Sequence, residues 1–193
     1  MKALDDLSFG VERGQIFCLL GPNGAGKTTS FNVITGKLPP TSGKLQEREK
    51  KITSVMDGTF TTGICQQTNT LWNYMTVKQH LQVYADLRGM QNVQAAESID
   101  FLLSTLDLEK HANKKIRQLS GGTKRKLCVA LAVIGEPDMI LLDEPTTGVD
   151  PIGRDQIRTL LKSLANNNSS SVIFSTHSMD DAEYLADKLG NFY

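Results

Sequence analysis

Residues 21–29 read Gly-Pro-Asn-Gly-Ala-Gly-Lys-Thr-Thr, which is the composition of a phosphate-binding loop. Gly21, Gly24 and Gly26 let the backbone adopt conformations closed to larger residues, so that successive N–H groups can point at one anion. A helix is expected to begin near Lys27, and its N-terminal N–H groups also favour an anion. Lys27 is expected to bind the β- and γ-phosphates of a nucleotide, and the Thr28 hydroxyl to bind a bridging Mg²⁺.

Two adjacent carboxylates, Asp143 and Glu144, directly follow the apolar residues 139–142. At the end of a buried strand that faces the phosphate loop, Asp143 is in a position to support the same Mg²⁺. Glu144 can hold and polarise a water molecule for attack on the γ-phosphate, provided that it lies in line with the leaving oxygen. Taken alone, the pair would fit an ordinary polar turn equally well.

A second anion-binding pattern occurs at Ser120-Gly121-Gly122, before another predicted helix. Serine is a preferred helix N-cap, and the glycines leave backbone donors uncovered. One domain already has its phosphate loop. A second phosphate site without a second nucleotide therefore calls for another molecule.

Apolar runs predict three buried strands, at residues 16–20, 139–142 and 172–175, and a shorter strand at 63–65. The three long runs are each followed by polar residues and a predicted helix. We therefore expect a mostly parallel sheet with its ligand at the carboxyl ends of the strands. Residues 3–20 alternate weakly, which predicts a β-hairpin as an N-terminal antiparallel portion leading into the phosphate loop.

Apolar residues recur every three or four positions in the middle of the chain, which predicts helices. We expect helices at residues 28–35, 76–89, 95–106, 122–134 and 154–165. Those between about 68 and 126 form a helical subdomain inserted in a single ATP-binding domain of residues 1–193. Residues 41–62 are polar and are expected to be mostly irregular.

Several polar features are expected simply to face solvent. These are the charged residues 47–51, the basic residues 124–126 on a helix face, and His80 and His111. A basic run can indicate nucleic acid, but a solvated patch is the more common reason for one.

The composition is that of a soluble globular domain, with 39% hydrophobic and 22% charged residues among 193. The 21 basic and 21 acidic residues balance, so the overall charge favours neither nucleic acid nor anionic lipid. The sequence as given has no apolar run long enough to span a bilayer and no secretion signal at its start. Cys18, Cys65 and Cys128 lack metal or disulfide spacing, and we expect Cys18 and Cys128 to be reduced and buried.

The order of these motifs resembles the nucleotide-binding domain of ABC transporters over roughly residues 3–189. The resemblance rests on residues 21–29, Gln67, 119–123, 139–144, 148–150 and His177. It implies an α/β fold of the P-loop NTPase type, with a mostly parallel sheet and a helical signature subdomain. It also implies binding and hydrolysis of ATP with Mg²⁺.

The resemblance assigns roles to individual residues. ATP would be bound by Gly21, Pro22, Asn23, Gly24, Ala25, Gly26, Lys27, Thr28 and Thr29, with Gln67 at the metal. Ser120, Gly121 and Gly122 would contact the γ-phosphate of ATP held by an opposing domain, so that ATP joins two domains head to tail. Asp150 would cross that interface. Glu144, His177 and Lys27 would be catalytic, and Mg²⁺ would be held by Thr28, Gln67 and Asp143.

Residues 17–20, 124–127 and 146–151 look most like subfamily A, whose members move lipids across membranes. Bacterial drug-export domains are close competitors. Either type implies transmembrane domains as partners, with Gln67 coupling to them, and a location on the cytosolic face of a membrane.

The sequence departs from the family pattern at several positions. Thr123 stands where glutamine is frequent, and Gln66 replaces a common proline, which leaves open whether Gln66 or Gln67 is the loop glutamine. The aromatic residue that stacks on adenine should lie upstream of Ala3, and the family continues with strands beyond Lys188. We therefore expect a fragment with weaker adenine binding and a damaged sheet edge.

Two other classes of function stay open at this point. One is a soluble ABC-type ATPase of DNA repair or translation. The repair proteins carry a long coiled coil between the phosphate loop and the signature, for which this chain has no room, and the translation proteins carry two such domains. The other is a module that is gated by nucleotide without hydrolysing it. The presence of Lys27, Asp143, Glu144 and His177 argues against that module.

Overall fold

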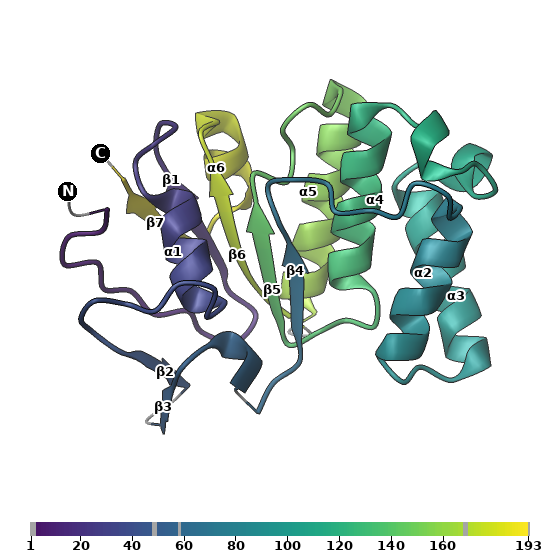
Figure 1. Ribbon diagram of the computed structural model, residues 1–193. Coiled ribbons are helices and arrows are strands. Elements are labelled where there is room, and N and C mark those ends of the chain that lie inside the picture. Colours follow the sequence, from purple (N-terminus) through teal and green to yellow (C-terminus); the bar gives the residue numbers. More distant parts are fainter. Residues whose placement is uncertain (1–2, 48–49, 58, 168–169, 193) are drawn as a thin grey trace.

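A single parallel sheet forms the centre of the molecule (Figure 1). The computed structural model describes residues 3–47, 50–57, 59–167 and 170–192. The strand order is β4-β5-β6-β1-β7, and every neighbouring pair is parallel. The strands are β1 (Ile16–Leu20), β4 (Thr62–Cys65), β5 (Met139–Asp143), β6 (Ser171–Thr176) and β7 (Lys188–Asn191). The predicted mostly parallel sheet is confirmed, and β7 is an edge strand that the sequence did not reveal.

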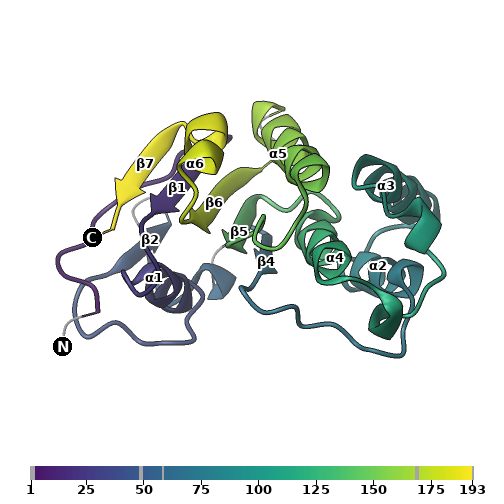
Figure 2. The same ribbon diagram turned by 90° about the horizontal axis from the view of Figure 1, so that it is seen from above.

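Helices cover both faces of this sheet (Figure 2). Helix α1 (Lys27–Ile34) lies on one face, and α5 (Pro151–Asn166) and α6 (Met179–Leu185) lie on the other. Helix α4 (Gly121–Val133) packs against β4 and α5, while α2 (Val77–Leu87) and α3 (Asn92–Thr105) lie beyond it, away from the sheet. Short 3₁₀ helices occur at Val55–Asp57, Glu109–His111 and Ile116–Gln118. Within the described ranges, no helix has the length and apolar character that a bilayer crossing requires.

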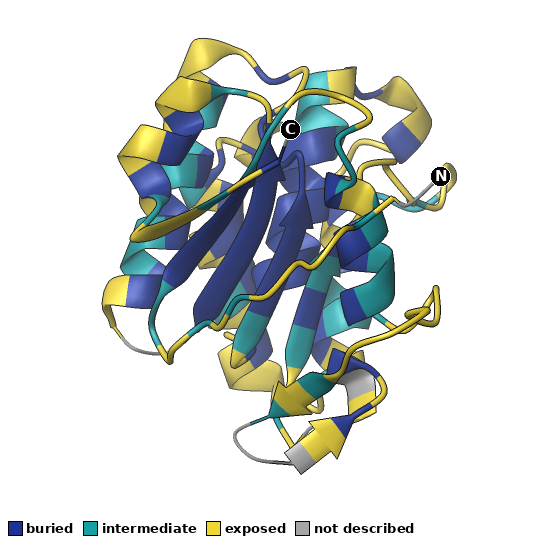
Figure 3. Ribbon diagram, turned by 90° about the vertical axis from the view of Figure 1, so that its left-hand side faces the viewer, coloured by how far each residue is buried: buried dark blue, intermediate teal, exposed yellow. Residues whose placement is uncertain are grey.

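The central strands are buried on both faces because helices cover both (Figure 3). Phe174 and Leu19 are fully buried there. Gly63 in β4 allows α4 to approach closely, since a Cβ atom on Gly63 would lie 1.8 Å from the carbonyl oxygen of Ala132. Helix α4 is therefore packed closely on β4.

Polar side chains fix where three helices begin. Ser120 caps α4 by accepting a hydrogen bond from the Thr123 N–H at 3.2 Å, which confirms the predicted N-cap. Asp150 caps α5 by accepting from the Gly153 N–H at 3.0 Å. Thr76 caps α2 in a reciprocal arrangement with the Gln79 side chain.

The predicted hairpin over residues 3–20 is wrong, because β1 is the only strand in the described part of that segment. The weak alternation there arises instead from a coil whose side chains pack on the sheet, and the Phe9 ring stacks on Phe17 with centroids 4.6 Å apart. The antiparallel sheet is formed by β2 (Leu45–Glu47) and β3 (Lys50–Ile52), in a segment predicted to be irregular. Of the charged run 47–51, Lys51 is exposed and Glu47 half-buried, while residues 48–49 lie outside the described residues.

The prediction that His80 is solvated is also wrong, because the side chain is fully buried. His80 lies three residues after Val77 and therefore on the inward face of α2. Its Nε2 accepts a hydrogen bond from the Trp72 N–H at 3.0 Å, so Nδ1, 2.9 Å from the Thr76 carbonyl oxygen, carries the proton. Burial lowers the pKa of His80, which keeps the ring neutral. His111 is half-buried.

Candidate functional site

The phosphate loop joins the end of β1 to the start of α1, as predicted. Gly24 and Gly26 have φ angles of +87° and +99°, a region that favours glycine. A Cβ atom on Gly26 would lie 2.6 Å from the carbonyl oxygen of Ala3. Gly26 is the N-cap residue of α1, and no side chain caps this helix. The N–H groups at its N-terminus are therefore left open toward the phosphate loop.

Lys27 is buried and places its ammonium group at this loop. Its Nζ donates to the carbonyl oxygens of Gly21 and Pro22 at 2.7 and 3.0 Å. The same atom lies 3.5 Å from Oε1 of Glu144. The ammonium group therefore stands between the phosphate loop and the end of β5.

The side-chain oxygens of Thr28 and Asp143 lie together at the carboxyl ends of the strands. The Thr28 hydroxyl donates to Oδ2 of Asp143 at 3.0 Å, and the Ser175 hydroxyl donates to Oδ1 at 2.5 Å. Hydroxyl and carboxylate oxygens are ligands that Mg²⁺ prefers, so the chemistry of these two residues fits that ion. The structure thus brings two of the three predicted metal ligands together, although they are 115 residues apart in sequence.

Glu144 is buried and has the left-handed φ angle of 53°, which is strained for a residue with a side chain. Its N–H donates to the Ser175 hydroxyl at 3.0 Å. Oε2 accepts from the Thr147 hydroxyl at 3.1 Å and lies 2.8 Å from Nδ1 of His177. Oε1 has no hydrogen-bond partner in the described part of the chain. Oε2 is therefore held in place by two hydrogen-bonding groups, while Oε1 accepts no hydrogen bond and forms an ion pair with Lys27.

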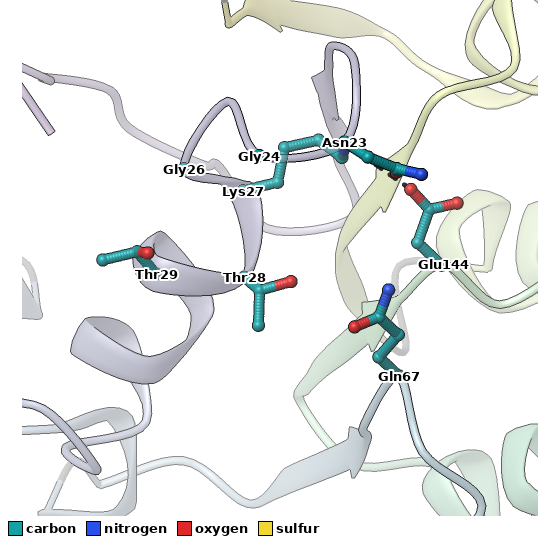
Figure 4. A pocket seen from close by; sticks show the side chains of 8 residues that line it. All are labelled: Asn23, Gly24, Gly26, Lys27, Thr28, Thr29, Gln67 and Glu144. Atoms are coloured by element: carbon teal, nitrogen blue, oxygen red, sulfur yellow. Dashed lines mark ion pairs between the residues drawn. The ribbon is translucent and has the colours of Figure 1, made fainter. Parts of the chain in front are cut away.

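These groups surround a cavity of about 200 Å³ (Figure 4). It is lined by Asn23, Gly24, Gly26, Lys27, Thr28, Thr29, Gln67 and Glu144. Its volume is below the range of about 300 to 1,000 Å³ typical of small-molecule pockets, so it suits the phosphates of a nucleotide and not the whole molecule. Gln67 contributes to this lining and Gln66 does not, which favours Gln67 as the loop glutamine.

The signature residues 119–123 do not line the cavity. Ser120 and Gly121 are exposed at the start of α4. Gly122 packs against the loop that precedes α5, where a Cβ atom would lie 2.9 Å from the carbonyl oxygen of Gly148. The second anion-binding pattern therefore lies at the surface, outside the chain's own cavity.

Sequence reasoning missed some residues that hold the site. Arg125 and Lys126 were predicted to be solvated, yet both are buried, because α4 is covered by the sheet on one side and α2 on the other. Arg125 donates to the carbonyl oxygens of Asp143 and Glu144. Ser175 appeared in the sequence only as a polar residue ending an apolar run. Thr147 appeared only within residues 146–151, with no predicted role of its own.

Comparisons with known proteins agree with this geometry. The family model described as ABC transporter matches residues 4–147. The cholesterol transporter ABCA5 of Rattus norvegicus is 38% identical over 185 residues, which cover 95% of this chain and 11% of that protein. ABC transporter A family member 7 of Arabidopsis thaliana is 39% identical over 193 residues, covering 98% of this chain and 20% of that protein.

Solved structures show the same architecture. The ATP-binding subunit of an ABC transporter has a TM-score of 0.87 at 26% identity, covering 99% of this chain and 80% of that one. A dimeric ATP-binding cassette in a post-hydrolysis state, bound to ADP and Pi, has a TM-score of 0.85 at 25% identity, covering 98% and 86%. The loop, the paired carboxylates and these similarities lead to one conclusion: the chain belongs to the ABC transporter family, as an ATP-binding cassette of the subfamily A type.

Proposed function

We propose that this cassette binds ATP and hydrolyses it to drive transport of a lipid across a membrane. The observation that carries the proposal is the Glu144 carboxylate, buried at the phosphate cavity with Oε2 hydrogen-bonded and Oε1 accepting no hydrogen bond in the described part of the chain. A general base needs both features, because the bonded oxygen fixes its orientation and the oxygen without a hydrogen-bond donor can accept a proton.

The catalytic roles follow from the positions of the side chains. Lys27 neutralises charge on the γ-phosphate, and Oε1 of Glu144 orients and deprotonates the attacking water. His177, bonded to the other oxygen of Glu144, supports that carboxylate and reaches the γ-phosphate from the exposed side. Thr28, Asp143 and Gln67 would hold Mg²⁺, which would supply positive charge against the β- and γ-phosphates.

A second cassette completes the site in this proposal. The exposed Ser120 and Gly121 lie outside the chain's own cavity, so they serve ATP held by another domain in a head-to-tail pair. Asp150 lies on the same loop as Gly148, against which Gly122 packs, and would cross that interface. The dimeric cassette among the similar structures supports this arrangement.

Lipid as the cargo is supported by the relatives, one of which is called a cholesterol transporter. This chain spans 11% to 20% of the length of the relatives described above. Transmembrane domains, and attachment to the cytosolic face of a membrane, are therefore proposed from the family and not from the cassette itself.

The test replaces Glu144 by glutamine. Glu144→Gln should keep ATP affinity, lower turnover by about 10²- to 10⁴-fold, and accumulate an ATP-bound dimer detectable by light scattering. Glu136→Gln is the matched control, because Glu136 is exposed and also has a left-handed φ angle, 47°, but lies outside the cavity. Turnover at the wild-type rate in Glu144→Gln would refute the assignment of the base.

The lipid assignment needs a separate experiment with the transporter that carries this cassette, reconstituted in vesicles. Movement of a labelled sterol or phospholipid should require ATP and should stop with Glu144→Gln. ATP-dependent movement of a hydrophilic drug with no lipid movement would contradict the proposed cargo.

A further inference from the structure

Arg125 is a buried cation whose recorded hydrogen-bond acceptors, within the described residues, are all carbonyl oxygens. Nη1 donates to the backbone carbonyls of Gln66 and Gln67 at 2.5 and 3.2 Å, and to the side-chain carbonyl of Asn69 at 3.3 Å. Nη2 donates to the backbone carbonyls of Asp143 and Glu144, the latter at 3.0 Å. The residue is only 3% exposed.

This one side chain joins three segments that are far apart in the sequence. Arg125 itself lies on α4, its first acceptors follow β4, and its last acceptors end β5. A planar guanidinium group with donors on both sides can bond two segments at once, which a lysine ammonium group cannot reproduce with the same geometry. The three segments are therefore fixed relative to one another at one point.

Two of the joined segments carry residues of the phosphate cavity. The bond to the Glu144 carbonyl, together with the bond from the Glu144 N–H to Ser175, holds the residue on both sides of its left-handed φ angle. The bond to the Gln67 carbonyl likewise fixes the backbone from which the Gln67 side chain enters the cavity. Any shift of Arg125 would move both side chains.

The third segment begins at Ser120. Arg125 lies five positions after Ser120, a rise of about 7.5 Å along the helix axis. A rigid helix transmits a displacement of its N-terminus over that distance. The position of the exposed signature end and the position of Glu144 are thus mechanically connected.

We propose that Arg125 is a positioning residue that makes the orientation of Glu144 and Gln67 depend on the position of the cassette's own signature helix, α4. The catalytic consequence rests on the proposed function. Binding of Ser120 to the nucleotide of a second cassette would then change the orientation of the first cassette's own base, Glu144, through the contacts of Arg125.

The test compares Arg125→Lys with Arg88→Lys. Arg88 also donates to a carbonyl oxygen of β4, that of Thr62 at 2.8 Å, but at the opposite end of the strand from the cavity. Arg125→Lys should lower kcat by about 10- to 100-fold, as expected for a displaced catalytic group, while the Kd for ATP changes less than about twofold. Arg88→Lys should leave both values unchanged.

A second measurement does not depend on turnover. Amide hydrogen exchange of the nucleotide-free protein should be faster in Arg125→Lys at residues 66–69 and 143–147 together, and unchanged there in Arg88→Lys. In the unmodified chain, a non-hydrolysable ATP analogue should protect these two segments and the start of α4 in parallel. This last measurement applies even if Arg125→Lys does not fold.

The outcomes separate this inference from the proposed function. Loss of stability in Arg125→Lys with unchanged kcat would show a merely structural role and overturn the inference, as would protection of the three segments at different ATP-analogue concentrations. Wild-type turnover in Glu144→Gln would instead overturn the assigned base, while hydrogen exchange would still decide whether Arg125 fixes the two segments.

Discussion

Gly121 and Gly122 are neighbours in the signature motif, yet we predict opposite effects on stability when each is changed to alanine. Both lie in the first turn of α4. A Cβ atom on Gly121 would meet nothing within 4 Å, whereas one on Gly122 would lie 2.9 Å from the Gly148 carbonyl oxygen and 3.5 Å from the Cα atom of Val149. The pair therefore isolates one contact between the signature motif and the loop before α5.

The magnitude follows from two opposing effects. Replacing glycine by alanine at a helical position stabilises the fold by about 0.4 to 1 kcal/mol, and this gain is common to both variants. Only Gly122→Ala adds a clash with backbone atoms, which costs about 1 to 3 kcal/mol. Because the common gain cancels, Gly122→Ala should be less stable than Gly121→Ala by about 1 to 3 kcal/mol, or about 2 to 12 °C in Tm for a chain of this size.

The assay is urea unfolding of both variants without nucleotide, followed by circular dichroism, with the wild type as reference. Nucleotide is omitted because both glycines are proposed to contact ATP of a second cassette. Gly121→Ala should unfold at or above the urea midpoint of the wild type, and Gly122→Ala below it. Identical midpoints for the two variants would refute the argument, since the contact with Gly148 would then be absent or freely adjustable in solution.

Three further predictions concern buried titratable groups. Burial lowers the pKa of His80 below 6.5, so the unfolded chain binds the proton first as the pH falls. The stability present above pH 6.5 should therefore be lost as the pH falls below that value. The urea midpoints at about pH 7.5 and pH 5.5 should differ less in His80→Gln than in the wild type. Asp181→Ala leaves Arg158, whose side chain is 11% exposed, without its main partner and should destabilise by about 3 to 5 kcal/mol. Asp155→Ala breaks an exposed pair with the same arginine and should cost at most about 0.5 kcal/mol in the same assay. Burial raises the pKa of Cys65 to about 12, so iodoacetamide at about pH 8 should label it only after unfolding, and rapid labelling of the native protein would contradict its burial.

Local sequence determined those parts of the fold whose signals lie within a few residues. The apolar runs gave β1, β5 and β6 because a strand covered on both faces has no polar positions to spare. Gly24 and Gly26 predicted the phosphate loop because their left-handed conformations disfavour other residues. Ser120 predicted the start of α4 for a similarly local reason, its bond to an N–H three residues away.

Predictions from the sequence failed where the burial of a residue depended on segments far away in the chain. The weak alternation of residues 3–20 predicted a hairpin, but the described residues of this segment form no strand before β1. His80 and Arg125 looked solvated because both are polar residues on helices, and only the elements packed over α2 and α4 show that they are enclosed. The hairpin of β2 and β3 escaped notice because its strands are three residues each.

The sequence by itself determined which chemical groups this cassette has, since the motif residues and their order required no partner to be recognised. Only the tertiary structure decided how those groups are oriented. The bond from His177 to Glu144 joins residues 33 positions apart, and the pairing of Thr28 with Asp143 joins residues 115 positions apart. The five carbonyls around Arg125 lie at least 18 positions from it along the chain. Such contacts depend on the order of strands in the sheet, which no local pattern encodes.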